Sequence, residues 1–252
     1  MAMLPAFSVV IPAFNEAIRI GDTLGKTIGY LESTSPESEI IVVNDGSTDG
    51  TGDVVREAFG KHAFQAMRLF ENFPNCGKGA AVRKGLLASS RPIGTFLDAD
   101  LSTPIDELPK IIQPVAAGGV DIAFGSRALN RKLIQNRQPW RREQAGRVFN
   151  LIVRLATGLS FWDTQCGFKS FRMASCRPII EVARIEGFGF DVELLLLAQR
   201  AGLKLEEIPV RWNHCEGSKV HFVHDSLRML YEVIALRSHL KAGDYDVALL
   251  RA

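Results

Sequence analysis

The sequence predicts an α/β fold in which a parallel sheet is covered by helices on both faces. Through the first half of the chain, short apolar segments alternate with segments that have the period of a helix, which is the pattern of repeated β-α-β units. Hydrophobic residues make up 46% of the 252 residues. This is enough for one large core and does not suggest a disordered chain.

Strands in the first half are predicted where apolar residues run without interruption, as they do in strands buried on both faces. These segments are residues 7–11, 39–43, 67–70, 94–97 and 120–125. Helical spacing predicts a helix over 18–31, and another is expected to follow the turn-forming and capping residues of 44–51 as far as Phe59. A third helix, over 77–88, begins at a glycine-rich entrance.

The second half of the chain is less regular. Apolar spacing predicts helices over 148–159, 191–201 and 226–240, and a last strand over 205–210. We see no repeat, low-complexity tract or linker. The simplest organisation is one domain over 1–222 and a C-terminal helical extension over 223–252. The extension is expected to pack on the domain, on a second subunit of a homodimer, or at a membrane surface.

Charge and cysteine usage exclude several classes of protein. The net charge of +2 argues against a nucleic-acid partner. The four cysteines are scattered, without a Cys-X-X-Cys pair, so neither a zinc site nor a disulfide framework is expected and a cytoplasmic location fits best. The first apolar segment lacks the features of a signal peptide. No apolar run reaches the ~18 residues of a membrane-spanning helix.

Two carboxylates, Asp98 and Asp100, directly follow the strand predicted over 94–97. Ligands of open α/β sheets bind at such strand ends. Neighbouring carboxylates repel each other unless a cation is present, and Mg²⁺ or Mn²⁺ binds through one or two carboxylates together with substrate phosphates. Acid pairs are also common in surface turns, so the role of this pair has to be inferred together with the residues at the other strand ends.

Two further strand ends have the same character, at 12–16 and 44–47. Since the carboxyl ends of parallel strands lie along one edge, these residues are expected to line one cleft with the acid pair. A nucleotide would find most of its contacts there. Asp45 can accept from a base N–H, Phe14 can pack on the base, Asp98 can accept from a ribose hydroxyl and Asp100 can hold a metal that bridges a diphosphate. The alternative for Asp45 is a cap on the helix that follows.

In this order, 12–16, 43–51 and 98–100 resemble the nucleotide-sugar cleft of the family 2 glycosyltransferases, which have the GT-A fold. Motifs further along are similar to those of the dolichyl-phosphate β-glucosyltransferases and, more distantly, the dolichyl-phosphate mannosyltransferases. They are Gly125-Ser126-Arg127, Asp163–Lys169, Phe190–Leu195 and Glu216–Lys219. The resemblance covers nearly the whole chain. It implies a Rossmann-like, mixed but mostly parallel sheet flanked by helices on both faces, with 1–222 as the catalytic domain.

The resemblance implies roles for individual residues. The nucleotide sugar would be bound by Pro12, Ala13, Phe14, Glu16, Val43, Asp45, Lys78, Asp98, Ala99 and Asp100. The metal, Mg²⁺ or Mn²⁺, would be held by Asp100 with Asp98. The acceptor would meet Arg127, Gln165 and Asp191. One departure is Ser102, which stands where many relatives have a glutamine ligand for the metal.

The implied reaction is metal-dependent transfer of a hexose, with inversion, from a nucleoside diphosphate sugar to a polyprenyl or dolichyl phosphate. UDP-glucose is the favoured donor. Asp100, through the metal, and Lys219 would stabilise the leaving diphosphate. A phosphate acceptor is already anionic, so Arg127 need only position it. A hydroxyl acceptor would need a general base, for which Asp163 is favoured over Asp191.

Three alternatives remain open from the sequence. The same fold could use a soluble hydroxyl acceptor, or GDP-mannose as donor, or it could be a non-catalytic module that binds nucleotide sugars. The intact acid pair, Asp98 and Asp100, argues against the last. A cluster containing His214, His221 and His224 suits no common metal motif and is interpreted as structural.

A run of basic residues surrounds an apolar stretch in the second half. The run comprises Arg131, Lys132, Arg137, Arg141, Arg142, Arg147 and Arg154. A solvated face explains such a run in most proteins. As a sharper hypothesis, an amphipathic helix over 144–159 would rest on an anionic membrane and bring a lipid phosphate to Arg127. The protein would then be peripheral at the cytoplasmic face of a membrane.

Overall fold

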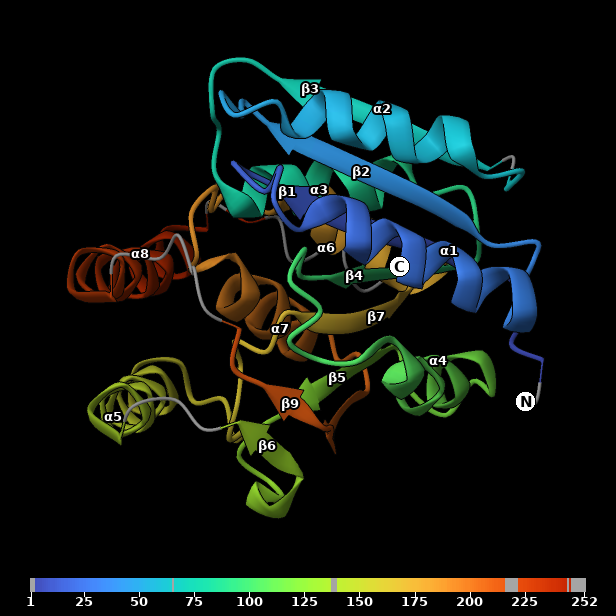
Figure 1. Cartoon of the computed structure of the whole chain (residues 1–252). Coiled ribbons are helices and arrows are strands. Elements are labelled where there is room, and N and C mark those ends of the chain that lie inside the picture. The colour runs from blue at the N-terminus through green and yellow to red at the C-terminus, as the bar shows by residue number, and fades with distance from the viewer. Residues whose placement is uncertain (1–2, 65, 137–139, 216–221, 244, 246–252) are drawn as a thin grey trace.

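A seven-stranded sheet with the strand order β3-β2-β1-β4-β7-β5-β8 forms the centre of the molecule (Figure 1). The computed structural model describes residues 3–64, 66–136, 140–215, 222–243 and 245. The strands are β1 Ser8–Ala13, β2 Glu39–Asp45, β3 Met67–Asn72, β4 Ile93–Leu97, β5 Ile122–Ser126, β7 Phe168–Arg172 and β8 Leu205–Pro209. β7 is antiparallel to both its neighbours, and the other pairs are parallel. The predicted mixed, mostly parallel sheet is confirmed.

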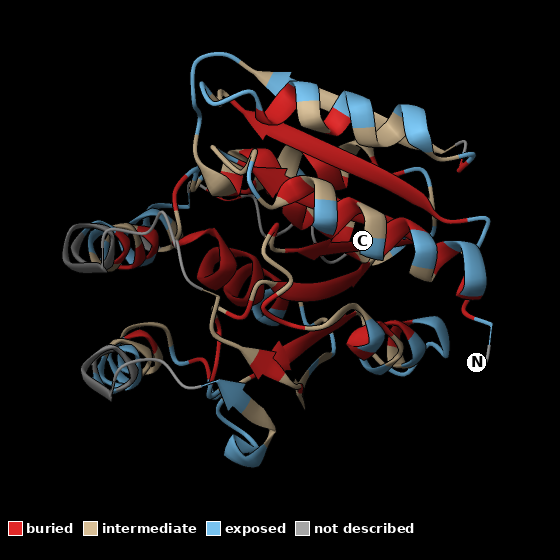
Figure 2. Ribbon diagram, viewed as in Figure 1, coloured by how far each residue is buried: buried red, intermediate tan, exposed pale blue. Residues whose placement is uncertain are grey.

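Helices cover both faces of this sheet. One face carries α1 Ile20–Thr34, α2 Thr51–Lys61 and α4 Leu108–Ala116, and the other carries α3 Lys78–Ala88, α6 Met173–Val182 and α7 Phe190–Arg200. The unbroken apolar run of β2 follows from this, because successive side chains point to opposite faces. Ile40 and Val42 enter one core, and Ile41 and Val43 enter the other. Figure 2 shows the buried strands between the two helical layers.

Three elements of the main sheet and its two helical layers were not expected from the sequence. The helices α4 and α6 contain prolines, Pro114 and Pro178, that argue against a helix. The strand β7 lies in a segment for which no helix or strand was predicted. All of its residues except the last are buried, including Lys169 and Ser170, so it shows neither alternation nor a plain apolar run. Its position between β4 and β5 makes the sheet mixed.

The remaining elements lie outside the seven-stranded sheet and the six helices that cover it. They include the strand pair β6 Ile134–Asn136 and β9 Trp212–Asn213, and the helices α5 Trp140–Thr157 and α8 Phe222–Ala242. Short 3-10 turns cover Ile105–Glu107 and Arg131–Leu133. The two helices contact each other and lie side by side in Figure 1, and α8 also contacts α7. Neither they nor any other helix in the described ranges has the length and apolarity needed to cross a bilayer.

The strand order reverses at β1. From β1 the sheet continues to β2 and β3 on one side and to β4 on the other. Such a switch point leaves a crevice at the carboxyl ends of the central strands, where ligands of open α/β sheets bind. The loops after β1, β2 and β4 meet there, and they contain the polar residues that the sequence singled out.

Candidate functional site

The loops after β1 and β2 are joined by hydrogen bonds. The backbone N–H of Asn15 donates to Ser47 Oγ at 2.9 Å, and that of Glu16 donates to Thr51 Oγ1 at 2.8 Å. Asn15 has a φ of +54°, in the left-handed region that asparagine tolerates better than most residues. These contacts form one wall of the crevice, from which Phe14 extends with 40% of its surface exposed. An exposed ring at this place is available to a nucleotide base.

Asp45 is buried at the end of β2 and accepts four hydrogen bonds. The donors are Asn72 Nδ2 at 2.7 Å, Asn75 Nδ2 at 2.9 Å, and the backbone N–H groups of Cys76 at 3.1 Å and Gly77 at 2.7 Å. A carboxylate has about four acceptor positions, so this one is fully used by the chain. Asp45 therefore shapes the loop 72–77, and a base N–H would have to replace one of these donors.

The alternative in which Asp45 caps the following helix is wrong. The helix α2 begins after Gly50, and the carboxylate of Asp49 accepts from the N–H of Thr51 at 3.1 Å. The loop 44–51 thus provides its own helix cap, four residues beyond Asp45.

Four other predicted nucleotide contacts have buried side chains. Pro12, Ala13 and Val43 lie within β1 and β2, and Ala99 is covered after β4. The carbonyl of Ala99 accepts from Thr23 Oγ1 at 2.6 Å. Contacts from these positions to a ligand in the crevice would therefore come from backbone atoms.

The two carboxylates after β4 have different surroundings. Asp98 Oδ1 lies 2.6 Å from Nζ of Lys78, at the start of α3. Burial disfavours the charged form of Lys78, but the carboxylates of Asp98 and Asp191 outweigh burial and raise the pKa of Lys78. Asp100 Oδ1 accepts from the backbone N–H of Ser102 at 2.8 Å. Asp98 is thus compensated by a lysine, whereas Asp100 is held by the turn that follows it.

This donor set fits a hard divalent cation. Carboxylate oxygens are the ligands that Mg²⁺ and Mn²⁺ prefer, and such ions keep several waters or phosphate oxygens. In the described ranges, no group of three or more His, Cys, Asp and Glu side chains is arranged to hold a metal by itself. A cation here would take one or two ligands from the protein. Asp100 is better placed than Asp98 to bind the cation, since Oδ1 of Asp98 already lies 2.6 Å from Nζ of Lys78.

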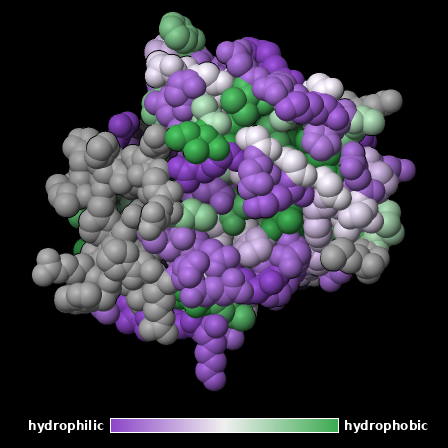
Figure 3. Space-filling model, viewed as in Figure 1, coloured by the Kyte–Doolittle hydropathy of each residue, from purple (hydrophilic) through white to green (hydrophobic). Residues whose placement is uncertain are grey.

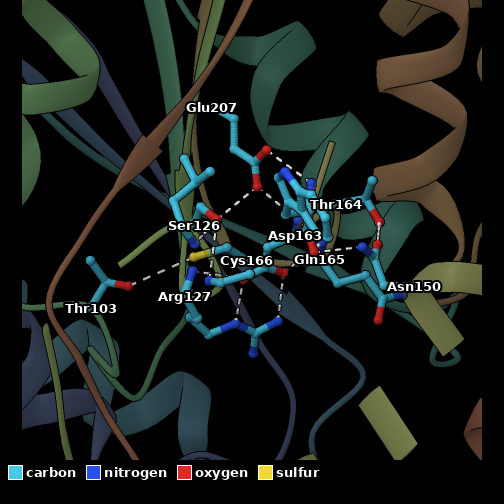
Figure 4. Close-up of polar contacts among 12 residues, drawn as sticks. Thr103, Ser126, Arg127, Asn150, Asp163, Thr164, Gln165, Cys166 and Glu207 are labelled. Carbon is cyan, nitrogen blue, oxygen red and sulfur yellow. Dashed lines mark hydrogen bonds and ion pairs between the residues drawn. The ribbon is translucent and has the colours of Figure 1, made fainter. Parts of the chain in front are cut away.

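Arg127 and Asp163 form a bidentate ion pair at the end of β5 (Figure 4). Arg127 Nε lies 2.6 Å from Asp163 Oδ2, Nη2 lies 2.8 Å from Oδ1, and the backbone N–H of Arg127 donates to Oδ2 at 2.9 Å. Burial opposes the charge of Asp163, but the guanidinium outweighs burial and holds the pKa of that carboxyl below its usual range. Asp163 is therefore a weak proton acceptor. Its geometry fits holding Arg127 better than activating a hydroxyl.

A second carboxylate supports this ion pair from β8. Glu207 Oε1 accepts from Ser126 Oγ at 2.7 Å and from the N–H of Asp163 at 2.7 Å, and Oε2 accepts from the N–H of Trp162 at 2.9 Å. Glu207 thereby ties the end of β5 to the loop that carries Asp163. We did not identify it from the sequence, where it is one of two glutamates in an ordinary short strand.

Asp191, predicted to meet the acceptor, lies inside the protein. Its Oδ1 is 2.6 Å from Nζ of Lys169, and the side chains are 5% and 0% exposed. Burial raises the pKa of Asp191 above its usual range. Direct contact between Asp191 and an acceptor is therefore not favoured. In the sequence, Lys169 is noted only as the last residue of the motif Asp163–Lys169, because no feature of the neighbouring sequence indicates that a lysine is buried.

A cavity of about 510 Å³ lies between α5, the end of β5 and the loop that carries Asp163. Four arginines line it, Arg127, Arg131, Arg147 and Arg154, and Asp163 is the one acid among its described lining residues. Its apolar side chains include Ile134, Leu151, Trp162 and Trp212. Gln165 also lines it, as predicted for an acceptor contact, although its amide reaches toward Met229 of α8. The cavity thus combines a strongly cationic wall with an apolar one.

Several predicted residues lie outside the described part of the chain. They are Arg137, Lys219 with the rest of 216–219, and His221. The side chains of Arg141, Arg142 and His224 also lie outside the description. The roles assigned to them stay predictions.

Comparison with known proteins places this crevice in a family. The model of glycosyl transferase family 2 matches residues 8–180. The chain belongs to glycosyl transferase family 2. Within that family it is similar to the dolichyl-phosphate beta-glucosyltransferases of Drosophila melanogaster (37% identity over 96% of this chain and 77% of that one) and Homo sapiens (31% over 94% and 76%).

Solved structures show the same fold. The glucosyl-3-phosphoglycerate synthase of Mycobacterium tuberculosis, in complex with Mn²⁺ and UDP-glucose, has a TM-score of 0.66 at 20% identity, over 94% of this chain and 79% of that one. The mannosyl-3-phosphoglycerate synthase of Rubrobacter xylanophilus has a TM-score of 0.65 at 18% identity, over 95% and 75%. These likenesses establish the GT-A-like architecture of this family 2 glycosyltransferase. As predicted, it is a glycosyltransferase, and it is similar to the dolichyl-phosphate beta-glucosyltransferases.

Proposed function

We propose that this glycosyltransferase transfers glucose from UDP-glucose to a polyprenyl or dolichyl phosphate, with inversion at the anomeric carbon and with Mg²⁺ or Mn²⁺. The observation that carries the proposal is the arginine-lined cavity next to the crevice. Four guanidiniums face one carboxylate there, and guanidinium is the side-chain group best suited to phosphate. The names of the relatives support dolichyl phosphate as the acceptor and glucose as the transferred sugar.

The state of Asp163 also favours a phosphate acceptor. A hydroxyl acceptor needs a base that can take its proton, and the bidentate pair with Arg127 leaves Asp163 with a pKa below the usual range. A phosphate oxygen is already anionic near neutral pH. Arg127 then needs only to orient the nucleophile, which is a matter of positioning rather than of proton transfer.

The apolar wall of the cavity favours a lipid over a small soluble acceptor. Trp162 lies under Arg154, with the guanidinium 4.3 Å from the ring centre, and Trp212 lies under Arg127 at 5.7 Å. A phosphoglycerate-like molecule would bring no hydrocarbon to Ile134 or Leu151. A polyprenyl phosphate would place its phosphate on the arginines and its first isoprene units on the tryptophans.

On the donor side, Asp100 and Asp98 would hold the divalent metal, which supplies charge stabilisation to the departing diphosphate when it is bound. Lys78 is paired with Asp98 at 2.6 Å, and Phe14 covers the base. Lys219, outside the described residues, is assigned to the leaving diphosphate by resemblance.

We also propose that α5 rests on the membrane that contains the lipid. Its exposed side includes Val148, Leu151 and Leu155, which are 57, 53 and 76% exposed. Lone exposed apolar residues need no explanation, but a group of them on one helix beside a cationic cavity fits an anionic bilayer surface. The Leu155→Glu variant is expected to lose flotation with anionic liposomes. Lys61→Ala, which changes the net charge equally on the remote helix α2, keeps it.

The proposed function is tested by a panel of donors with Mn²⁺. UDP-glucose, GDP-mannose and other sugar nucleotides are each incubated with and without a short polyprenyl phosphate, and with 3-phosphoglycerate as a soluble acceptor. We expect turnover only with UDP-glucose and the lipid phosphate. Arg154→Gln should raise the KM for the lipid phosphate about tenfold, equivalent to about 1.4 kcal/mol, while Arg56→Gln on α2 leaves it unchanged. Transfer to phosphoglycerate, or turnover that is independent of the lipid, contradicts the proposal.

A further inference from the structure

Lys169 lies in β7, the strand that separates the donor half of the site from the acceptor half. Its neighbours across the sheet are Phe96 in β4 and Phe124 in β5, whose ring centres lie 5.4 and 6.0 Å from Nζ. The lysine side chain is fully buried. A charge in such surroundings is costly unless oxygen atoms compensate it.

Two oxygens do so, and they belong to different segments. Nζ lies 2.6 Å from Oδ1 of Asp191, in the first turn of α7, and donates to the carbonyl of Cys166 at 2.6 Å. A buried ion pair is seldom the most stable way to fill a core, because two apolar side chains of similar volume often serve as well or better. The position of the two partners therefore suggests a role other than stability.

The Cys166 carbonyl belongs to the loop 163–167, which joins the two halves of the site. At its beginning, Asp163 holds Arg127 by two hydrogen bonds. At its end, Gly167 accepts from the N–H of Asp98 at 3.1 Å. A side chain at Gly167 would collide with the carboxylate of Asp98, so the backbone packs directly on that residue. Any shift of this loop moves Arg127 relative to Asp98.

Asp191 is joined to the donor half by the packing of α7 on α3. A Cβ at Gly79, next to Lys78, would lie 2.7 Å from Cβ of Phe190, next to Asp191, and Lys78 is paired with Asp98 at 2.6 Å. Lysines and carboxylates thus alternate from the sheet core to the crevice, in the order Lys169, Asp191, Lys78 and Asp98.

We infer that Lys169 is a positioning residue for glycosyl transfer, which sets the spacing between Asp98 and Arg127 by holding the loop 163–167 and Asp191 at the same time. It contacts neither donor nor acceptor. The inference rests on the proposed function for its acceptor half, while its donor half rests on the crevice alone.

The test uses the double variant Lys169→Met/Asp191→Leu, which replaces the ion pair by apolar side chains of similar size and is expected to fold. The single variant Asp191→Asn separates the effect of the carboxylate from that of the lysine. We expect the double variant to keep its circular dichroism and a cooperative thermal transition. Its kcat should fall about 100-fold, as for a reacting geometry displaced by about 1 Å, and its Kd for UDP with Mn²⁺ should rise about tenfold.

A control removes an ion pair elsewhere in which only the carboxylate is buried. Arg68 pairs with the buried Glu39 at 2.6 Å, at the amino end of β2 and therefore at the edge of the sheet opposite the crevice. Arg68→Met should lower the melting temperature and leave kcat, KM and UDP affinity unchanged. A purely structural role for Lys169 predicts the same pattern for the double variant, so a folded double variant with normal kcat and UDP affinity overturns the inference.

The two proposals fail in different ways. If the natural protein transfers no sugar to polyprenyl phosphate, the proposed acceptor is wrong, and the UDP titration still tests Lys169. If the natural protein is active and the double variant binds UDP and turns over normally, the inference fails and the proposed function stands.

Discussion

The three aspartates at the strand ends, Asp45, Asp98 and Asp100, have different surroundings. Asp45 receives four hydrogen bonds from the loop 72–77, Asp98 is paired with Lys78, and Asp100 is held by one backbone N–H from Ser102. Asp100, whose side chain has a single hydrogen bond and no cationic partner among the described residues, is the carboxylate best able to take an external cation. In the sequence, all three acids are candidate ligand contacts because of their residue type. In the structure, their different hydrogen-bond and ion-pair partners give them different roles.

The Asp100→Asn variant should fold normally, because the side chain is only partly buried and its amide oxygen can still accept the hydrogen bond from Ser102. Its kcat should fall about 100-fold, equivalent to about 2.7 kcal/mol of transition-state stabilisation, and the Mn²⁺ concentration for half-maximal activity should rise. Steady-state kinetics over a Mn²⁺ series measures both. Asp22→Asn, an exposed acid of α1, is the control, and equal kinetics for the two variants would exclude a metal role for Asp100.

The Asp45→Asn variant should lose stability. An amide can accept on one oxygen only, so two of the four buried donors lose their acceptor, at a cost of about 2 kcal/mol. Urea unfolding should show a lower midpoint with an unchanged slope. Because the loop 72–77 leads into Lys78, the KM for the donor should rise as well. An unchanged midpoint would mean that the loop does not depend on this carboxylate.

At the scale of elements, close packing explains why α3 contains two glycines, Gly79 in its first turn and Gly85 further along. A Cβ at Gly79 would meet the backbone of the 185–187 segment, and one at Gly85 would meet Val10 of β1 and Val43 of β2. With glycine at these two positions, the helix packs more closely against the sheet and the 185–187 segment than it could with any larger residue there. That approach places Lys78 beside Asp98, at the end of β4.

The Gly85→Ala variant should be destabilised by about 1–3 kcal/mol, because overpacking against Val10 outweighs the better helix propensity of alanine. Gly25→Ala on α1 is the matched control. A Cβ there meets nothing within 4 Å, so the same substitution should stabilise the protein by up to about 1 kcal/mol. Thermal or urea unfolding compares the two, and a gain at Gly85 would contradict this account of the helix packing.

At the scale of the whole molecule, buried carboxylates link segments that are distant in sequence. Glu39 accepts from Ser8, Ser90 and Arg68, and Glu107 accepts from Arg211 and Lys110. Burial opposes ionisation in both cases, but the hydrogen bonds outweigh it and lower the pKa of Glu39 and of Glu107. Hydrophilic side chains cover much of the described surface seen in Figure 3, whereas these two carboxylates are buried.

Stability should therefore fall in acid. A carboxyl whose folded pKa lies below its unfolded value stabilises the fold fully above the unfolded pKa, about 4.3 for glutamate, and loses this contribution as the pH falls through the folded pKa. Asp191 acts in the opposite sense, because burial raises its pKa. We expect the melting temperature to be nearly constant from pH 7 to 5 and to fall below about pH 4.

The check is thermal unfolding of the natural protein and of Glu107→Gln between pH 3 and 7. The variant should be less stable at pH 7 and should lose less stability on acidification. An identical pH profile for the two proteins would contradict the role given to Glu107.

The sequence by itself determined the α/β class, the presence of helices on both faces of the sheet except for α4 and α6, and the residues at the carboxyl ends of β1, β2 and β4. These features can be recognised from neighbouring residues alone, because an apolar run that stops at polar residues indicates the end of a strand whatever its tertiary contacts. The antiparallel strand β7, the pair Arg127–Asp163 and the contact of Ser126 with Glu207 were decided only in three dimensions. Their partners lie 36 and 81 positions apart for the last two, and no local pattern records which carboxylate a given arginine or serine will meet. The burial of Lys169 shows the same limit, because a lysine in a short strand acquires its role from the sheet that closes around it.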